Sequence, residues 1–105
     1  MEYNYSVVEI RKTETFERRL LGLRDHRAVA RINARIRRIA PGNPSDVKPG
    51  RGGVSELRID YGPGYRIYFL QHGKELIILL ANGDKRTQAR DIKKALELAS
   101  MLEEI

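Results

Sequence analysis

Polar and apolar residues alternate most regularly between Val54 and Phe69. Leu57 and Ile59 are separated by polar neighbours, the two-residue period of a half-buried strand. The segment Gly62–Gly64 then interrupts the pattern, and its two glycines permit the positive φ angles of a tight connection. Apolar residues return at every second position from Tyr65. The pattern therefore predicts two short strands joined by a tight turn.

The other face of this predicted hairpin contains candidate binding residues. Because side chains alternate along a strand, Arg58, Arg66 and Tyr68 are expected on one exposed surface. Two guanidinium groups beside an aromatic ring suit a phosphate next to a base, with the Tyr68 ring stacked on that base.

Periodicity of three and four residues predicts three helices. Thr13 is placed to cap the first helix, the second covers His26–Ala40, and Asp84 is placed to cap the last. Strands are expected at Ser6–Arg11 and at Leu76–Ala81, the latter apolar on both faces and hence central in a sheet. The predicted fold is a single α+β domain over residues 1–105, in the order β-α-α-β-β-β-α, with a small antiparallel-rich sheet packed against helices.

The net charge of +6 favours an anionic partner, and it is unevenly distributed. Residues 11–40 contain ten Lys and Arg against three acids, whereas residues 41–105 contain ten against nine. Five arginines follow one stripe of the second helical region: Arg24, Arg27, Arg31, Arg35 and Arg38. This stripe fits a surface that follows RNA phosphates, a surface for an acidic protein, or simply a solvated helix face.

Two further basic pairs lie in connecting segments. Lys48 and Arg51 fall in a loop rich in proline and glycine, which is either a basic RNA-binding loop or, more commonly, a plain connector. Its glycines lack the GK[ST] ending and the preceding strand of a phosphate-binding loop. Lys85 and Arg86 stand between the central strand and the last helix, where an anion site has a physical basis. The alternative interpretation is that Lys85 and Arg86 merely flank a turn.

The composition excludes several classes of function. The chain has no cysteine and only two histidines, His26 and His72, which are far apart in sequence. A metal site is therefore not expected. No apolar run approaches the roughly 18 residues of a membrane span, and the N-terminal residues lack the features of a signal peptide. The sequence favours a soluble cytoplasmic protein without a bound cofactor.

Several motifs together resemble the RelE/ParE superfamily of toxins, in the HigB-like branch known as addiction module killer proteins. They are ELR at Glu56–Arg58, GYRIYF at Gly64–Phe69 and NGDKRTQARDI at Asn82–Ile92. Matching segments also occur at Ile10–Phe16 and Gly42–Pro49, so the resemblance covers nearly the whole chain.

The resemblance implies the toxin of a type II toxin–antitoxin module. Such a toxin cleaves mRNA on the ribosome by attack of the 2′-hydroxyl, requires no metal, and is neutralised by an antitoxin encoded beside it, commonly of the helix-turn-helix type. By the same resemblance, Arg66 holds the phosphate, Arg58 stands where a residue activates the 2′-hydroxyl, and Lys85 and Arg86 face the leaving or equatorial oxygens. Tyr68, Lys48, Arg51, Arg31 and Arg35 complete the expected RNA-binding set.

Other functions remain open at the level of sequence. A ParE-like toxin would inhibit DNA gyrase by binding alone, and a simple RNA-binding module would lack chemistry altogether. Ile92 occupies the region where some relatives have a catalytic tyrosine, and no histidine lies near the C-terminus. Glu56 and Asp60 are expected on the face of Arg58, where either accepts a proton or forms a salt bridge with the arginine.

Overall fold

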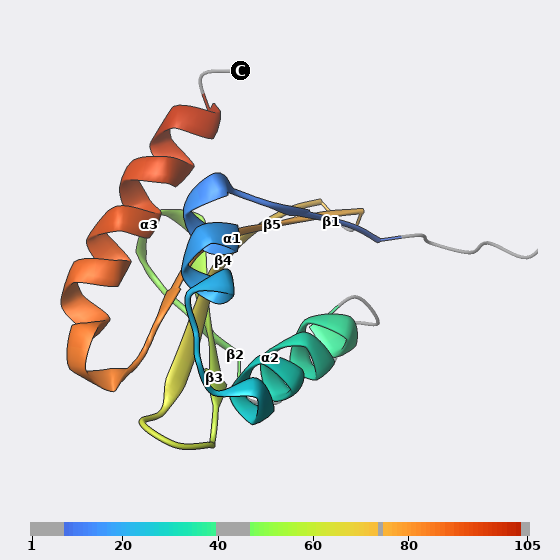
Figure 1. Ribbon diagram of the computed structural model, residues 1–105. Helices are drawn as coiled ribbons and strands as arrows, with labels where there is room; N and C mark the ends of the chain where they lie inside the picture. The colour runs from blue at the N-terminus through green and yellow to red at the C-terminus, as the bar shows by residue number, and fades with distance from the viewer. Residues whose placement is uncertain (1–7, 40–46, 74, 104–105) are drawn as a thin grey trace, which may run out of the picture.

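The computed structural model describes residues 8–39, 47–73 and 75–103. Within these ranges, five strands and three α-helices form three layers, with α1 and α2 on one face of the sheet and α3 on the other (Figure 1). The elements are β1 (Glu9–Lys12), α1 (Glu14–Leu21), α2 (His26–Ile39), β2 (Val47–Pro49), β3 (Val54–Ile59), β4 (Tyr65–His72), β5 (Leu76–Gly83) and α3 (Gln88–Glu103), with short 3₁₀ turns at Arg51–Gly53 and Lys85–Thr87.

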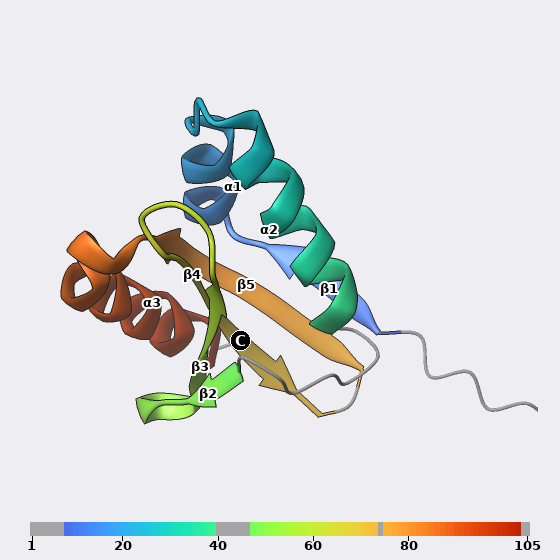
Figure 2. The ribbon, with the colours of Figure 1, turned by 90° about the horizontal axis from the view of Figure 1, so that it is seen from below.

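The strands are arranged in the order β1-β5-β4-β3-β2. Strands β2 to β5 pair antiparallel with their neighbours, whereas β1 runs parallel to β5. Figure 2 shows the sheet between the α1–α2 pair and α3. The predicted α+β architecture, an antiparallel-rich sheet packed against helices, is confirmed.

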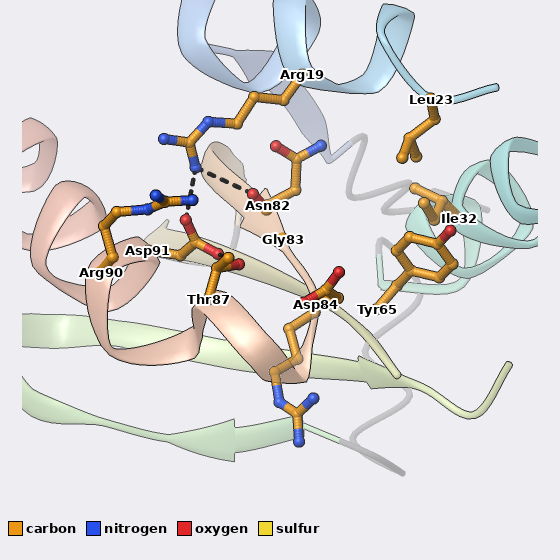
Figure 3. A pocket seen from close by; sticks show the side chains of 11 residues that line it. Arg19, Leu23, Ile32, Tyr65, Asn82, Gly83, Asp84, Thr87, Arg90 and Asp91 are labelled. Atoms are coloured by element: carbon orange, nitrogen blue, oxygen red, sulfur yellow. Dashed lines mark hydrogen bonds and ion pairs between the residues drawn. The ribbon is translucent and has the colours of Figure 1, made fainter. Parts of the chain in front are cut away.

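The two outer layers are connected beyond the end of β5 (Figure 3). Arg19 of α1 donates from Nη1 to Oδ1 of Asp91 in α3 at 2.9 Å and to the carbonyl oxygen of Asn82 at 3.1 Å. Asp91 is only 1% exposed, and its other oxygen accepts a hydrogen bond from the hydroxyl of Thr87. The Arg19–Asp91 ion pair therefore links α1 to α3, and Arg19 also joins α1 to the end of β5.

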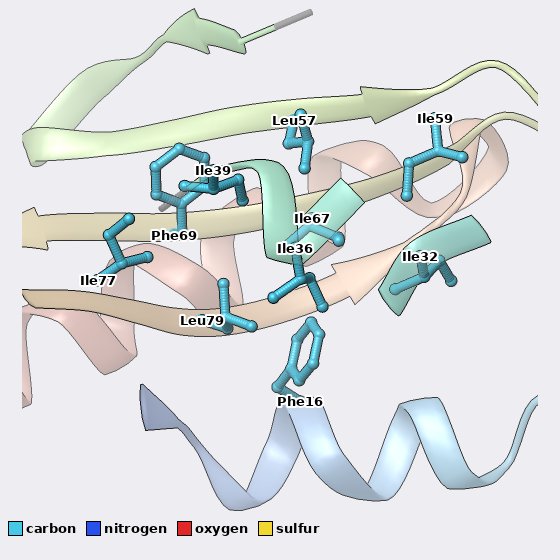
Figure 4. Close-up of a cluster of buried hydrophobic side chains, with 10 residues drawn as sticks. All are labelled: Phe16, Ile32, Ile36, Ile39, Leu57, Ile59, Ile67, Phe69, Ile77 and Leu79. Carbon is cyan, nitrogen blue, oxygen red and sulfur yellow. The ribbon is translucent and has the colours of Figure 1, made fainter. Parts of the chain in front are cut away.

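Each face of the sheet has its own core. The larger core packs α1 and α2 on the strands, with Phe16 between the helices and the sheet (Figure 4). Its other members are Ile32, Ile36, Ile39, Leu57, Ile59, Ile67, Phe69, Ile77 and Leu79. The second core lies under α3 and contains Val54, Tyr68, Leu80, Ala81, Ala95 and Ala99. Burial on both faces explains why β5 is apolar from Leu76 to Ala81.

A β-bulge decides which side chains of β5 meet which core. Tyr68 pairs with Ala81 but Phe69 pairs with Leu79, so Leu80 is an extra residue on β5. Consequently Leu80 and Ala81 both belong to the core under α3. The bulge then directs the next side chain, that of Asn82, toward α1, where its amide nitrogen reaches the carbonyl oxygen of Phe16 at 3.5 Å.

The residues that cap the helices can be identified in the structure. The side chain of Thr13 accepts a hydrogen bond from the backbone of Phe16 and caps α1, and Asp25 does the same for the first residues of α2. Asp84, predicted to cap the last helix, instead caps the 3₁₀ turn Lys85–Thr87 that precedes α3. Parts of the predicted first strand, Ser6 and Val7, and the predicted end of the second helix, Ala40, lie outside the described residues.

The predicted element order was incomplete. The segment predicted to be a loop contains β2, which pairs antiparallel with β3 through the register Val47–Leu57. Three residues ending in a proline have no alternating pattern of their own. They form a strand because β3 offers them a free edge, where proline is tolerated.

Candidate functional site

One carboxylate organises the polar face of the hairpin. Glu56 of β3 accepts hydrogen bonds from Nε of Arg66 at 3.1 Å and Nε2 of Gln88 at 2.8 Å, both on Oε1. Its Oε2 lies 3.4 Å from Nε of Arg58. The sequence left open whether Glu56 forms a salt bridge or accepts a proton, and the structure shows that it forms salt bridges with both arginines. Two guanidinium groups are thus fixed side by side.

The guanidinium group of Arg66 is also held by the β3–β4 turn. Nη1 of Arg66 donates to the carbonyl oxygen of Gly64 at 2.8 Å. Gly64 has a φ of 80°, and a Cβ placed there would lie 3.3 Å from Nη1 of Arg66 and 3.8 Å from Cβ of Lys85. The turn, Arg66 and Lys85 therefore converge, and glycine is the residue that this conformation and this crowding favour.

Arg58 and Arg66 line the same groove at the hairpin end, with a volume of about 300 Å³. We call it the hairpin groove; its other lining residues are Ile59, Asp60, Gly64 and Tyr65. The side chain of Arg58 is 51% exposed, whereas that of Arg66 is 9% exposed. Arg58 is therefore the guanidinium that an anion in the groove meets first.

Arg58 also borders two further hollows. One, of about 250 Å³, lies against α2 and is called the arginine groove; it is lined by Arg31, Ala34, Arg35, Arg38, Arg58, Ile59 and Asp60. The other, of about 270 Å³, lies against α3 and is called the α3 cavity; it includes Lys48, Arg51, Ser55, Glu56, Arg58, Tyr68 and Gln88. The structure thus brings the predicted RNA-binding arginines and the basic residues of the loop together around Arg58.

The arginine face of α2 is held by local contacts. The guanidinium carbon of Arg31 lies 4.6 Å from the centre of the Tyr61 ring, a cation–π contact. The hydroxyl of Tyr61 donates to Oδ2 of Asp25 at 3.1 Å. Backbone hydrogen bonds from the first turn of α2, together with the Tyr61 hydroxyl, lower the pKa of Asp25. The β3–β4 turn and α2 are joined by this chain of contacts.

The prediction that Arg58, Arg66 and Tyr68 share an exposed surface was wrong for two of the three. Arg66 is 8% exposed and Tyr68 is 1% exposed. Both side chains point toward α3, which covers this face of the sheet, and the Tyr68 ring belongs to the core there. The buried ring is not available to stack on a base, and burial raises the pKa of its hydroxyl.

Lys85 and Arg86 differ in their surroundings. Lys85 is exposed beside Gly64 and thus close to the hairpin groove. Arg86 instead turns back to Asp84, with Nη2 at 2.9 Å from Oδ2, although its side chain is 81% exposed. The hydrogen bond from the Arg86 side chain lowers the pKa of Asp84. The charge of Arg86 is therefore already paired, whereas that of Lys85 faces solvent.

A fourth hollow was not predicted from the sequence. This Asn82 cavity, of about 280 Å³, lies between α1, α2 and the start of α3 (Figure 3). Its lining comprises Arg19, Leu23, Ile32, Tyr65, Arg66, Asn82, Gly83, Asp84, Thr87, Arg90 and Asp91. The one available signal was Asp91, an acid within the otherwise apolar stripe of the last helix.

The described residues show neither a metal cluster nor a membrane helix. Their His, Asp and Glu side chains form no group of three or more that could hold a metal ion. Among the helices of the described ranges, each is too short or too polar to cross a membrane.

Comparison with solved structures establishes the fold. A double mutant of the E. coli toxin RelE in the free state superposes with a TM-score of 0.64, covering 84% of this chain and 97% of that chain at 11% sequence identity. The chain therefore has the RelE-like toxin fold.

Comparison of sequences identifies a relative. No protein-family model matches the chain. An uncharacterized protein of Haemophilus influenzae is 48% identical over 95 residues, which span 90% of this chain and 96% of the relative. At this identity and coverage, the chain belongs to the same family as that Haemophilus influenzae protein.

Proposed function

We propose that the chain is the toxin of a type II toxin–antitoxin module and acts as an endoribonuclease that cleaves mRNA on the ribosome. The observation that carries this proposal is the arrangement of Arg58 and Arg66, which share the carboxylate of Glu56 and line the same groove. The RelE-like fold supports the assignment to this class of toxin.

The proposed reaction uses the 2′-hydroxyl of the RNA itself. The 2′-oxygen forms a bond to the adjacent phosphorus while the bond from phosphorus to the 5′-oxygen of the next nucleotide breaks. The products are a 2′,3′-cyclic phosphate and a 5′-hydroxyl, so the proton lost by the 2′-oxygen is matched by one gained at the 5′-oxygen. Negative charge spreads over the phosphate oxygens in the transition state, and preorganised cations stabilise it.

The geometry suggests a division of roles in the hairpin groove. Arg58, half exposed, binds the phosphate oxygens directly. Arg66, which is buried beside Arg58, adds its positive charge to the groove and is held in place by Glu56 and by the carbonyl of Gly64. Lys85, exposed beside Gly64, is placed to stabilise the leaving oxygen. Glu56 acts by orienting the arginines, because both of its oxygens already accept hydrogen bonds.

The neighbouring hollows give the RNA strand a path on either side of the scissile phosphate. The arginine groove on α2 supplies Arg31 and Arg35, and the α3 cavity supplies Lys48 and Arg51. Both hollows adjoin Arg58, so a single strand that crosses the hairpin groove would meet basic side chains before and after the cleavage site. The same surface has the charge that an acidic segment of an antitoxin would require to occlude it.

The test is cleavage in a translating extract followed by mapping of RNA 5′ ends. Addition of the purified chain is expected to produce cuts within codons that leave 5′-hydroxyl ends. Arg58→Ala should lower the rate by about 10²–10³-fold, the cost of removing one preorganised donor of this kind. Arg37→Ala is the matched control, because Arg37 is exposed on α2 and lines none of the four hollows.

Two outcomes would contradict the proposal. Equal cleavage by the Arg58→Ala and Arg37→Ala variants would place the chemistry elsewhere. Intact RNA, together with inhibited supercoiling by purified DNA gyrase, would favour a ParE-like toxin that acts by binding.

A further inference from the structure

The Asn82 cavity adjoins the hairpin groove but takes no part in the reaction proposed above. Tyr65 and Arg66 line both hollows, so the two hollows lie next to each other. The walls of the cavity differ at its two ends. Leu23, Ile32 and Tyr65 form an apolar end, and the amide of Asn82 lies opposite them with Arg19 and Asp91 (Figure 3).

Asn82 has incomplete hydrogen bonding in this structure. The residue is 6% exposed, and its Oδ1 has no donor among the described residues. Its Nδ2 is held only by a long contact of 3.5 Å to the carbonyl oxygen of Phe16. A buried amide oxygen without a donor is costly, and a terminal amide can turn about a broad torsional minimum. A ligand that brings an N–H group into the cavity would complete this set of bonds.

The guanidinium group of Arg19 supplies hydrogen-bond donors beside the amide of Asn82. Its Nη1 is used by Asp91 and by the carbonyl oxygen of Asn82. The N–H groups on Nη2 and Nε have no acceptor in the described part of the chain. Because the buried carboxylate of Asp91 fixes the guanidinium, the Arg19 side chain lines the cavity without a large loss of side-chain freedom on binding.

We propose that the Asn82 cavity binds one unpaired RNA base of the strand whose phosphate occupies the hairpin groove, and that Asn82 selects which base enters. This inference rests on the proposed ribonuclease function. The edge of every base places an N–H donor close to an acceptor, which matches Asn82 Oδ1 beside the Arg19 guanidinium. The planar body of the base would pack on the apolar end, against Tyr65 and Leu23.

The position of Arg66 favours a base over a protein side chain as the occupant. A base is covalently linked to the ribose and phosphate of its own nucleotide. Arg66 and the adjacent Tyr65 line both a cavity suited to the base and a groove suited to the phosphate. The volume of about 280 Å³ is near the lower limit of roughly 300 Å³ for small-molecule sites. It therefore suits a single base better than a larger ligand.

The first experiment measures binding without any cleavage. The four nucleoside 5′-monophosphates are titrated into ¹⁵N-labelled protein while the side-chain amide of Asn82 and Nε of Arg19 are followed by NMR. We expect saturable shifts at both groups, with at least a tenfold difference in affinity between the tightest and weakest bases. Asn82→Asp should weaken the tightest base at least tenfold, whereas Asn33→Asp, at a position of α2 that does not line this cavity, should not.

The second experiment maps RNA ends produced by the wild type and by these two variants. Cleavage by the Asn82→Asp variant with an altered base preference, and an unchanged preference in Asn33→Asp, supports the proposal. Cleavage with an unchanged preference and no NMR shift at Asn82 overturns the cavity assignment and leaves the ribonuclease function standing.

The remaining outcomes are also decisive. If the wild type cuts no RNA, the proposed function fails, and the titration alone decides whether the cavity binds bases. If Asn82→Asp does not fold, the wild-type titration carries the test. Shifts at Asn82 caused by an antitoxin protein but by none of the mononucleotides would assign the cavity to a protein side chain and overturn the proposal.

Discussion

Arg58 and Arg66 stand directly opposite each other across β3 and β4. Two like charges at such a position destabilise a sheet. Here the carboxylate of Glu56, two residues from Arg58 on the same face of β3, lies within hydrogen-bond range of both guanidinium groups. The hairpin therefore concentrates positive charge at one place and depends on a single buried acid to do so.

Replacing that acid should weaken the fold. Glu56→Gln keeps the size of the side chain but leaves the opposed arginines without a negative charge. We expect a loss of about 1.5–3 kcal/mol in the free energy of unfolding, the range for hydrogen bonds to charged groups. Urea denaturation measures it. Adding Arg58→Gln to this variant should recover part of the loss, because the like-charge pair is then gone. A loss within about 0.5 kcal/mol, ordinary for surface substitutions, would contradict this role of Glu56.

Glycine should be required at position 83, because the buried carboxylate of Asp91 occupies the space that a side chain would need. A Cβ at Gly83 would lie 1.8 Å from Oδ2 of Asp91 and 2.9 Å from Oγ1 of Thr87, so Gly83→Ala must displace the acid. The expected cost is about 1–3 kcal/mol, typical of overpacking. In an Asp91→Ala background the same substitution should cost much less, since the obstructing atoms are absent. Equal costs in the two backgrounds, measured by a double-mutant cycle, would show that the backbone moves instead.

The ring and the hydroxyl of Tyr68 should contribute very differently. Tyr68→Ala removes a ring from the core under α3 and is expected to cost about 3–5 kcal/mol. Tyr68→Phe removes a buried hydroxyl that has no hydrogen-bond partner among the described residues, so stability should be unchanged or slightly higher. Thermal unfolding of both variants tests this. A loss above about 1.5 kcal/mol in Tyr68→Phe, the upper value for a typical hydrogen bond, would reveal a partner of the hydroxyl.

These residues also mark the limit of prediction from sequence. Alternation and turn glycines were sufficient to predict the hairpin, because both are local properties. The same pattern predicted the face of Arg66 and Tyr68 correctly but not their burial. Burial depends on α3, which packs on that face from more than 20 residues further along the chain. Local periodicity describes the faces of an element and not what covers them.

Two other features had no local signal at all. β2 forms only because β3 has a free edge for Val47–Pro49. The Asn82 cavity depends on the bulge at Leu80, which turns Asn82 toward α1, and on Arg19 and Asp91, which meet across 72 residues of sequence. Positions brought together by a register shift and a long-range ion pair cannot be read from periodicity.

Lowering the pH should remove the stabilisation of the folded state that the Asp84–Arg86 ion pair provides. The hydrogen bond from Arg86 lowers the pKa of Asp84 below its usual value of 3.8 in the folded state. A lowered pKa stabilises the folded state at pH values above the unfolded pKa, and this contribution disappears as the pH falls through the lower, folded value. Asp84→Asn retains a capping side chain but loses the ion pair. Melting temperatures of wild type and variant should differ at pH 5–7, a range about one unit or more above the unfolded pKa, and converge below the folded value. A difference that stays constant from pH 7 down to below the folded pKa of Asp84 would exclude the ion pair as its cause.

Salt dependence should distinguish the arginines that contact RNA from those that do not. Arg31 and Arg35 line the arginine groove, whereas Arg37 of the same helix is exposed outside it. Each phosphate neutralised on a single strand contributes about 0.7 to the slope of log K against log salt concentration. If both arginines contact phosphates, the Arg31→Ala/Arg35→Ala variant should reduce the slope by about 1.4, with Arg37→Ala close to wild type. Fluorescence anisotropy with a short labelled RNA between 50 and 200 mM salt, about the range over which such contacts are resolved, gives the slopes. Equal slopes in all three proteins would mean that the arginine face of α2 does not carry RNA, and an acidic protein would then be the partner to test on it.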